Sequence, residues 1–87
     1  MSRDQAVNEK LEAVLRKYVP HVPSGVPLPR ETPLAELGVD SMQMIGLLVE
    51  VEKTFGLVIP DAALLPERIG SAGRLGALIE DLLKTPG

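Results

Sequence analysis

The stretch Leu37-Gly38-Val39-Asp40-Ser41-Met42 leads directly into an apolar-rich segment that runs to Phe55. Asp40 and Ser41 are both favoured at the start of a helix, where a side-chain oxygen accepts a hydrogen bond from a free backbone N–H group. Gly56 is typical of the position just after a helix end. The pattern therefore predicts a helix that begins at Asp40 or Ser41 and ends at Phe55.

This helix carries two apolar stripes. At about 100° per residue, the stripe expected to face the core consists of Met44, Leu47, Leu48, Val51 and Phe55. The second stripe lies roughly opposite and consists of Met42, Ile45 and Val49. A helix in a small bundle buries only one broad face, so we expect the second stripe to be exposed and to contact partners. The alternative is that Met42 and Ile45 pack against the preceding loop.

A first helix is predicted over about residues 3–18. Its apolar side chains recur at helical spacing and are Val7, Leu11, Val14, Leu15 and Tyr18. Ser2 and Gln5 have the spacing of a capping box, and Pro20 ends the helix because the residue before a proline avoids the helical region.

Residues 19–40 contain five prolines, which exclude a regular helix or a central strand. We expect this long loop to lie against the bundle through Val26, Leu28, Leu34 and Leu37. His21 also falls here, and a solvated loop histidine is a better interpretation than a catalytic one.

Beyond Gly56, residues 57–60 are predicted to be an extended linker, with Asp61 capping a short turn to Leu65 and residues 66–69 forming a separate turn. Ser71 is a candidate N-cap of a last helix, whose expected buried stripe is Ala72, Leu75, Leu78, Ile79 and Leu82. Gly73 and Gly76 each weaken this helix by about 1 kcal/mol relative to alanine, so it should depend on packing.

Composition narrows the class of protein. The 87 residues are 45% hydrophobic but only 2% aromatic, which favours a single all-α domain, residues 1–87, with an aliphatic core. The absence of cysteine and the single histidine exclude a disulfide framework and a Cys- or His-rich metal site. The net charge of −3 argues against nucleic acid, and no apolar run reaches a membrane span. We expect a soluble, cytoplasmic monomer.

Ser41 has three possible roles. A hydrolase nucleophile would need a general base and an oxyanion hole, and the sequence of this short chain contains no motif that indicates either of them. A simple N-cap is possible, although Asp40 could fill that role equally well. The third role is a covalent attachment point, because the positive end of the helix dipole would favour the negative charge of a phosphodiester at Ser41.

The motif Leu37-Gly38-Val39-Asp40-Ser41-Met42 resembles the L-G-x-D-S-[LM] signature of acyl and peptidyl carrier proteins. The downstream segment 51–61 (VEKTFGLVIPD) is similar to the part of these carriers that closes helix two, and the resemblance extends over nearly the whole chain. It implies a four-helix carrier bundle with three main helices, a short third helix and a long loop between helices one and two.

The resemblance also implies a function. Ser41 would receive 4′-phosphopantetheine from coenzyme A through a phosphopantetheinyl transferase, with Asp40 at the family's preceding acidic position. A loading ligase or acyltransferase and downstream synthase or tailoring enzymes would be the other partners. Met42, Gln43, Ile45 and Val49 would contact partner enzymes. The carrier itself would catalyse nothing and would hold no metal.

The second helix departs from carriers of bacterial fatty acid synthesis, which line it with carboxylates. Here the outward positions are expected to include Gln43, Gly46 and Lys53, leaving Glu50 and Glu52 as its acidic residues. This favours a specialised pathway, such as polyketide or nonribosomal peptide synthesis, for a discrete carrier or a domain of a larger synthase. The alternative is an unmodified helical docking module that binds through Met42, Ile45 and Val49.

Overall fold

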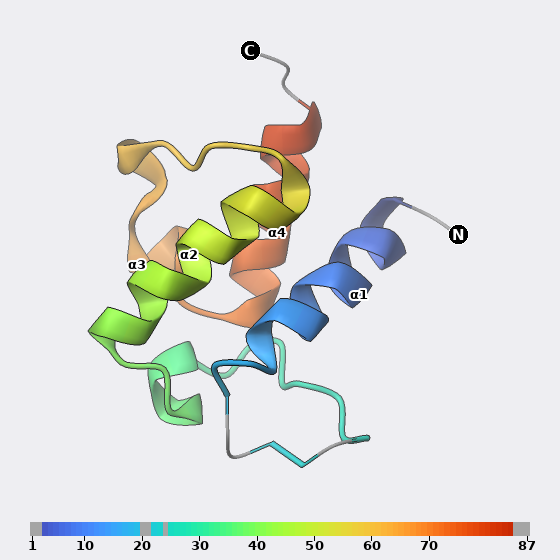
Figure 1. The fold of residues 1–87 in the computed structure, drawn as a ribbon, viewed down its shortest axis with the longest axis vertical. Helices are drawn as coiled ribbons and strands as arrows, with labels where there is room; N and C mark the ends of the chain where they lie inside the picture. Colours follow the sequence, from blue (N-terminus) through green and yellow to red (C-terminus); the bar gives the residue numbers. More distant parts are fainter. Residues whose placement is uncertain (1–2, 20–21, 24, 85–87) are drawn as a thin grey trace.

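A computed structural model describes residues 3–19, 22–23 and 25–84 and shows helices surrounding an apolar core (Figure 1). The three long helices are α1 (Arg3–Leu15), α2 (Ser41–Phe55) and α4 (Ala72–Lys84), and α3 (Pro66–Ile69) is short. Two 3-10 helices, η1 (Leu34–Leu37) and η2 (Asp61–Ala63), interrupt the connections. Within these described ranges the only β-type pairing is an isolated bridge between Pro33 and Ser71. The predicted all-α fold with a short third helix is confirmed.

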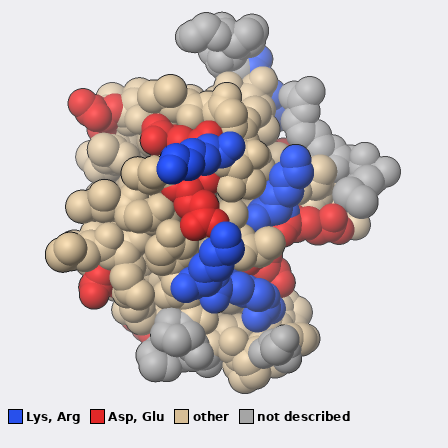
Figure 2. Space-filling view, in the orientation of Figure 1, with Lys and Arg blue, Asp and Glu red and all other residues tan. Residues whose placement is uncertain are grey.

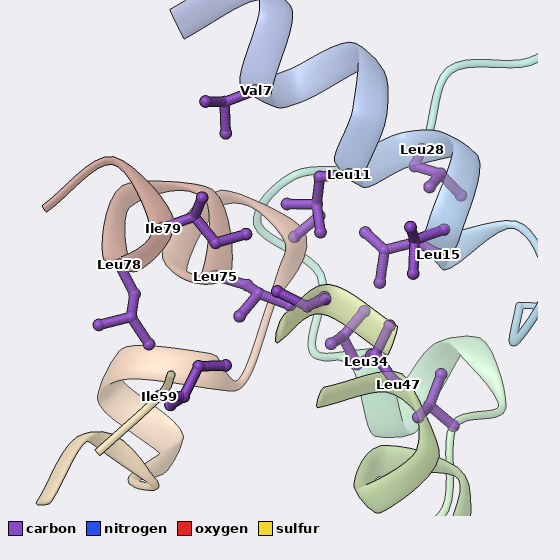
Figure 3. Close-up of a cluster of buried hydrophobic side chains, with 14 of the residues drawn as sticks. Val7, Leu11, Leu15, Leu28, Leu34, Leu47, Ile59, Leu75, Leu78 and Ile79 are labelled. Atoms are coloured by element: carbon purple, nitrogen blue, oxygen red, sulfur yellow. The ribbon is translucent and has the colours of Figure 1, made fainter. Parts of the chain in front are cut away.

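Aliphatic side chains from α1, α2 and α4 meet in the core, joined by residues of the connecting segments (Figure 3). The largest fully buried side chains are Leu11, Leu15, Leu34, Leu47, Leu75, Leu78, Ile79 and Val51. Met44, Leu48, Phe55 and Leu82 pack against this core while only partly buried. The predicted stripes of all three long helices therefore face inward, although Phe55 lies nearer the edge than a central core position.

The first helix ends at Leu15, three residues earlier than predicted. The chain then tightens, with the Lys17 N–H donating to the Val14 carbonyl at 3.1 Å and the Tyr18 N–H to Leu15 at 2.8 Å. This 3-10-type spacing often finishes an α-helix. The predicted capping box involves Ser2, which lies outside the described residues.

The long loop contains one element that the proline pattern concealed. Pro33 precedes η1 as its N-cap, a position where a missing N–H group costs nothing, and Leu34 is buried. The expectation of a purely irregular loop was therefore wrong at residues 34–37. Val26 was also wrong as an apolar anchor, since it is 47% exposed, whereas Leu28 is buried. His21 lies outside the described residues.

The loop and α4 approach each other closely at Gly73. Its N–H donates to the Arg30 carbonyl at 2.8 Å, and a Cβ at this position would lie 2.9 Å from the same oxygen. The glycine that weakens the helix locally is thus required where the loop crosses it. Ser71 caps α4 as predicted, because its Oγ accepts a hydrogen bond from the Arg74 N–H at 3.2 Å.

The segment before α3 differs slightly from its prediction. Asp61 is the first residue of η2 and follows the N-cap Pro60, so its side chain does not cap the turn. The turn ends at Ala63 rather than Leu65. Pro66 begins α3 at a position where proline is favoured, in agreement with the predicted turn at residues 66–69.

Candidate functional site

A glycine in the left-handed backbone conformation directs the chain into α2. Gly38, with φ of 97°, ends η1, and its N–H donates to the Ala35 carbonyl. The Val39 N–H donates to Leu34 at 3.1 Å, and the Val39 side chain is buried. A side chain is strained at this φ, so the L-G-V order anchors the loop and places the next residue at the start of α2.

Asp40 is the N-cap of α2, and Gln43 completes a capping box. The Asp40 Oδ1 accepts from the Gln43 N–H at 2.8 Å, and the Gln43 Oε1 accepts from the Asp40 N–H at 3.1 Å. Asp40 therefore takes the capping role that the sequence left open between it and Ser41. Gln43, predicted to contact partners, has a structural use for its amide oxygen at this end of the helix.

Ser41 is the first residue of α2 and is exposed. Its hydroxyl group takes part in none of the hydrogen bonds formed among the described residues. The N–H groups of the first helical turn have no preceding carbonyl to bind, and together with the helix dipole they favour a negative group. Ser41 thus combines a free hydroxyl with a local environment suited to a phosphodiester.

A groove of about 660 Å³ opens beside Ser41. It runs between the start of α2 and the segment that contains α3, and Met44, Leu64 and Ile69 supply much of its apolar wall. Ser71 and Arg74 from the start of α4, together with Asp40, add polar groups. The sequence pattern did not reveal this groove, because Leu64 and Ile69 come near Ser41 only through the path of the chain after α2.

The second stripe of α2 is exposed, as predicted. Met42, Ile45 and Val49 are 81%, 66% and 44% exposed, which excludes the alternative that Met42 and Ile45 pack against the loop. In Figure 2 the charged side chains gather mainly in a band near the middle of the visible face, and the surface to its left is largely uncharged.

Tyr18 and Lys17 join the end of α1 to α2 through Glu50. The Tyr18 hydroxyl donates to Glu50 at 2.9 Å, and the Lys17 ammonium contacts the same carboxylate at 2.5 Å. The hydrogen bond from Lys17, followed by that from Tyr18, lowers the pKa of Glu50. In return, hydrogen bonding to Glu50 raises the pKa values of Lys17 and Tyr18.

Gly46 was predicted to lie at an outward position, but it is half-buried. A Cβ there would lie 3.6 Å from the Tyr18 ring, so Tyr18 covers this part of α2. The sequence pattern placed Tyr18 on the core stripe of the first helix but gave no signal of its contact with Gly46 and Glu50. That contact depends on the tight turn that ends α1.

Residues 21–79, more than half of the chain, match the phosphopantetheine attachment site family. The chain belongs to this family. It is a carrier protein, and the prosthetic group of its family is 4′-phosphopantetheine. The exposed Ser41 hydroxyl, which forms no competing hydrogen bond with the residues that the structure describes, fits the covalent attachment of such a group.

The fold of this carrier protein is similar to that of a chain in the crystal structure of Bradyrhizobium japonicum glycine:[carrier protein] ligase complexed with glycylated carrier protein. The TM-score is 0.61 at 20% identity, over 87% of this chain and 96% of the other. At this identity the match supports the carrier fold and not the cargo.

The part of the carrier protein that the structure describes holds no group of three or more His, Asp or Glu side chains suited to a metal ion. No helix in the same residues is long and apolar enough to cross a membrane.

Proposed function

We propose that Ser41 is the residue to which 4′-phosphopantetheine is attached and that the chain carries acyl or aminoacyl groups between enzymes. The observation that carries this proposal is the position of Ser41, whose exposed hydroxyl lies at the start of α2 and makes no hydrogen bond with the described residues. Since Asp40 already caps the helix, Ser41 is not needed as a cap.

The attachment reaction needs the Ser41 oxygen as a nucleophile. That oxygen attacks the phosphorus of coenzyme A that bears the pantetheine arm, forming a new P–O bond. The P–O bond to the adenosine-3′,5′-diphosphate leaving group breaks, and the hydroxyl proton passes to a base of the transferase. When bound, the prosthetic group supplies a thiol that holds a cargo as a thioester, which accounts for thiol chemistry in a chain without cysteine.

Asp40 has two effects in this proposal. Its capping box fixes the first turn of α2 and so fixes the position of the neighbouring serine. Its carboxylate lies at the same helix end, where it can assist the metal ion that accompanies the phosphate donor in the transferase. It also repels the attached phosphate slightly, an effect that the helix dipole opposes.

The cargo is proposed to be loaded by a dedicated ligase or acyltransferase and passed to synthase or tailoring enzymes of a specialised pathway, such as polyketide or nonribosomal peptide synthesis. The structurally similar carrier is described as glycylated and in complex with its ligase, which supports an aminoacyl-loading partner. The apolar, weakly acidic surface of α2 supports a pathway other than bacterial fatty acid synthesis. We propose that these steps occur in the cytoplasm.

The test is the intact mass of the protein before and after incubation with coenzyme A and a broad-specificity phosphopantetheinyl transferase. We expect a gain of one phosphopantetheinyl unit in the wild type and none in Ser41→Ala. Thr54→Ala is the matched control, because Thr54 is another exposed hydroxyl residue on α2 but lies far from its N-terminus. It should gain the same mass as the wild type.

The second candidate function is an unmodified docking module, which the exposure of Met42, Ile45 and Val49 favours. A folded, unmodified wild-type protein that gains no mass would support this candidate and contradict the attachment of the prosthetic group to Ser41.

A further inference from the structure

The groove beside Ser41 ends at a small cluster of polar side chains. Glu31, Ser71 and Arg74 line this groove and also a second hollow of about 320 Å³. Ser41 lines only the first of the two. The three shared residues therefore lie where the two hollows meet, at the end of the groove away from Ser41. The groove thus leads from the exposed serine, along an apolar wall, to a polar end.

Arg74 supplies the positive charge at this end. It is exposed, and it is the only cationic residue among the described residues that line the groove. Its Nη1 donates to the Glu67 carbonyl at 2.9 Å, which holds the guanidinium beside α3. Its Nε and Nη2 are not used in hydrogen bonds or ion pairs within the described ranges. A carboxylate suits these free donors, because a guanidinium binds it through two parallel hydrogen bonds.

Ser71 adds a second donor, and Glu31 opposes it. Ser71 is buried, with 5% of its surface exposed, and its Oγ accepts from the Arg74 N–H at 3.2 Å. Its hydroxyl hydrogen donates to none of the described residues. Glu31 is exposed and forms none of the ion pairs found in the same residues, so it does not neutralise Arg74. An anion at this end would be attracted by Arg74 and repelled by Glu31.

We propose that this groove receives the cargo carried on Ser41, and that Arg74 favours cargoes with a carboxylate at the end remote from the thioester, which are the half-thioesters of dicarboxylic acids. The cargo carboxylate accepts hydrogen bonds from Arg74 and Ser71, and its carbon chain lies on the apolar wall. Arg74 is then a specificity-determining residue. This inference rests on the proposed function, since the cargo is held by the group attached to Ser41.

Size and tethering both favour this occupant. The groove volume of about 660 Å³ falls within the range of about 300–1,000 Å³ that is usual for small-molecule sites. A cargo on a flexible arm that starts at a lining residue has an effective concentration of about millimolar at the groove. An exposed contact between arginine and carboxylate is weak by itself. Tethering allows such a contact to form where the free molecule would not be captured.

The absence of cysteine allows a direct test. The chain is first loaded from coenzyme A by a broad-specificity transferase, and the thiol of the attached arm is then the only thiol in the protein. Alkylation with ¹³C-carboxyl-labelled 4-bromobutyrate adds a stable cargo that ends in a carboxylate. Alkylation with 4-bromobutyramide adds a neutral cargo of the same shape. Intact mass establishes each step.

The first measurement is the pKa of the labelled carboxyl group, followed by NMR. It is compared in the wild type, Arg74→Gln, Arg74→Lys, Glu31→Gln and Arg68→Gln, with alkylated coenzyme A as the free reference. Arg68 is the matched control, because it is an exposed arginine on α3 that pairs with Asp81 and does not line the groove. The second measurement is the Tm of the carboxylate and amide forms near neutral pH.

We expect the cargo carboxyl in the wild type to have a pKa at least about 0.5 below that of the free reference, because a nearby cation favours the charged form. Arg74→Gln should remove this difference, Arg74→Lys should keep part of it, and Arg68→Gln should leave it unchanged. Glu31→Gln should lower the pKa further. The carboxylate form of the wild type should also have a higher Tm than its amide form, and Arg74→Gln should abolish that gain.

A wild-type cargo pKa equal to that of the free reference, or equal responses to Arg74→Gln and Arg68→Gln, would contradict the role of Arg74 while the attachment at Ser41 stands. A folded, unmodified chain that gains no mass from coenzyme A would instead overturn the proposed function, and this inference with it.

Discussion

The two faces of α2 are built from the same kind of side chain but lie in opposite environments. Leu47 and Val51 have no exposed surface, whereas Met42 and Ile45 are mostly exposed. Between the faces, Gly46 lies under Tyr18 and Glu50 binds the end of α1. One helix therefore holds the bundle together with one face and leaves the other apolar face uncovered.

This difference shows which face serves folding, and it supports our proposal that the exposed face binds partners. Burying an aliphatic side chain contributes about 1.5–3 kcal/mol, and the exposed stripe, above all Met42 and Ile45, contributes little of this to the isolated domain. Its apolar character instead matches a surface that is covered when a partner binds. Replacements on the two faces should therefore separate stability from partner turnover.

The largest effect on stability is expected at the buried face. Leu47→Ala should lower the free energy of unfolding by about 2–5 kcal/mol, because it leaves a cavity at a fully buried position. Phe55→Ala is the comparison at the edge of the core and should cost less, since Phe55 is only partly buried. Chemical denaturation measures both values, and a smaller loss for Leu47→Ala than for Phe55→Ala would contradict the assignment of the buried face.

A smaller effect, of opposite sign, is expected between the faces. Gly46→Ala should raise the free energy of unfolding by about 0.5–1 kcal/mol, because alanine is the better helix former and its Cβ would meet the Tyr18 ring at an ordinary contact distance of 3.6 Å. Gly73→Ala is the matched control, where the Arg30 carbonyl leaves no room for a Cβ. It should fail to stabilise the protein, and equal gains at both positions would show that Tyr18 and Arg30 do not lie as described.

The effect at Glu50 depends on pH. Its lowered pKa means that the contacts with Lys17 and Tyr18 stabilise the fold above the usual glutamate pKa of 4.5 and are lost as the pH falls through the lowered value. Glu50→Gln should therefore lower Tm near neutral pH, and the difference from the wild type should shrink in acid. Thermal unfolding followed across this pH range measures the difference, and one that is independent of pH would exclude the charged contact.

The smallest effect on stability is expected at the exposed face. Ile45→Glu and Val49→Glu should change the free energy of unfolding by no more than about 0.5 kcal/mol while lowering the rate at which a partner enzyme modifies the protein. Circular dichroism and transferase kinetics measure the two properties on the same samples. Unfolding of either variant would place the second stripe in the core.

The sequence predicted the helices well because their apolar periodicity, prolines and glycines act locally. The capping residues predicted a start of α2 at Asp40 or Ser41 and an end at Phe55, and the helical spacing predicted the exposure of Met42 and Ile45. The motif of residues 37–42 drew attention to Ser41. The sequence could not decide whether Asp40 or Ser41 caps α2, and the structure shows that Asp40 fills this role.

The features that the sequence did not predict depend on contacts between distant segments. η1 forms where residues 33–34 meet the chain around residues 70–71, as the hydrogen bond from the Leu34 N–H to the Gly70 carbonyl shows. The early end of α1 accompanies the hydrogen bond from the Tyr18 hydroxyl to Glu50, which lies 32 positions further along the chain. The groove beside Ser41 likewise joins residues from four elements. No local sequence pattern encodes contacts between segments that lie so far apart in the chain.

The most direct test of the central claim is the position of the modification within the chain. After incubation with coenzyme A and the transferase, tryptic cleavage after Arg30 and Lys53 should release the peptide of residues 31–53, in which Thr32 and Ser41 are the only hydroxyl residues. Tandem mass spectrometry should place one phosphopantetheinyl group on Ser41. A group on Thr32, or on a peptide outside residues 31–53, would contradict the account.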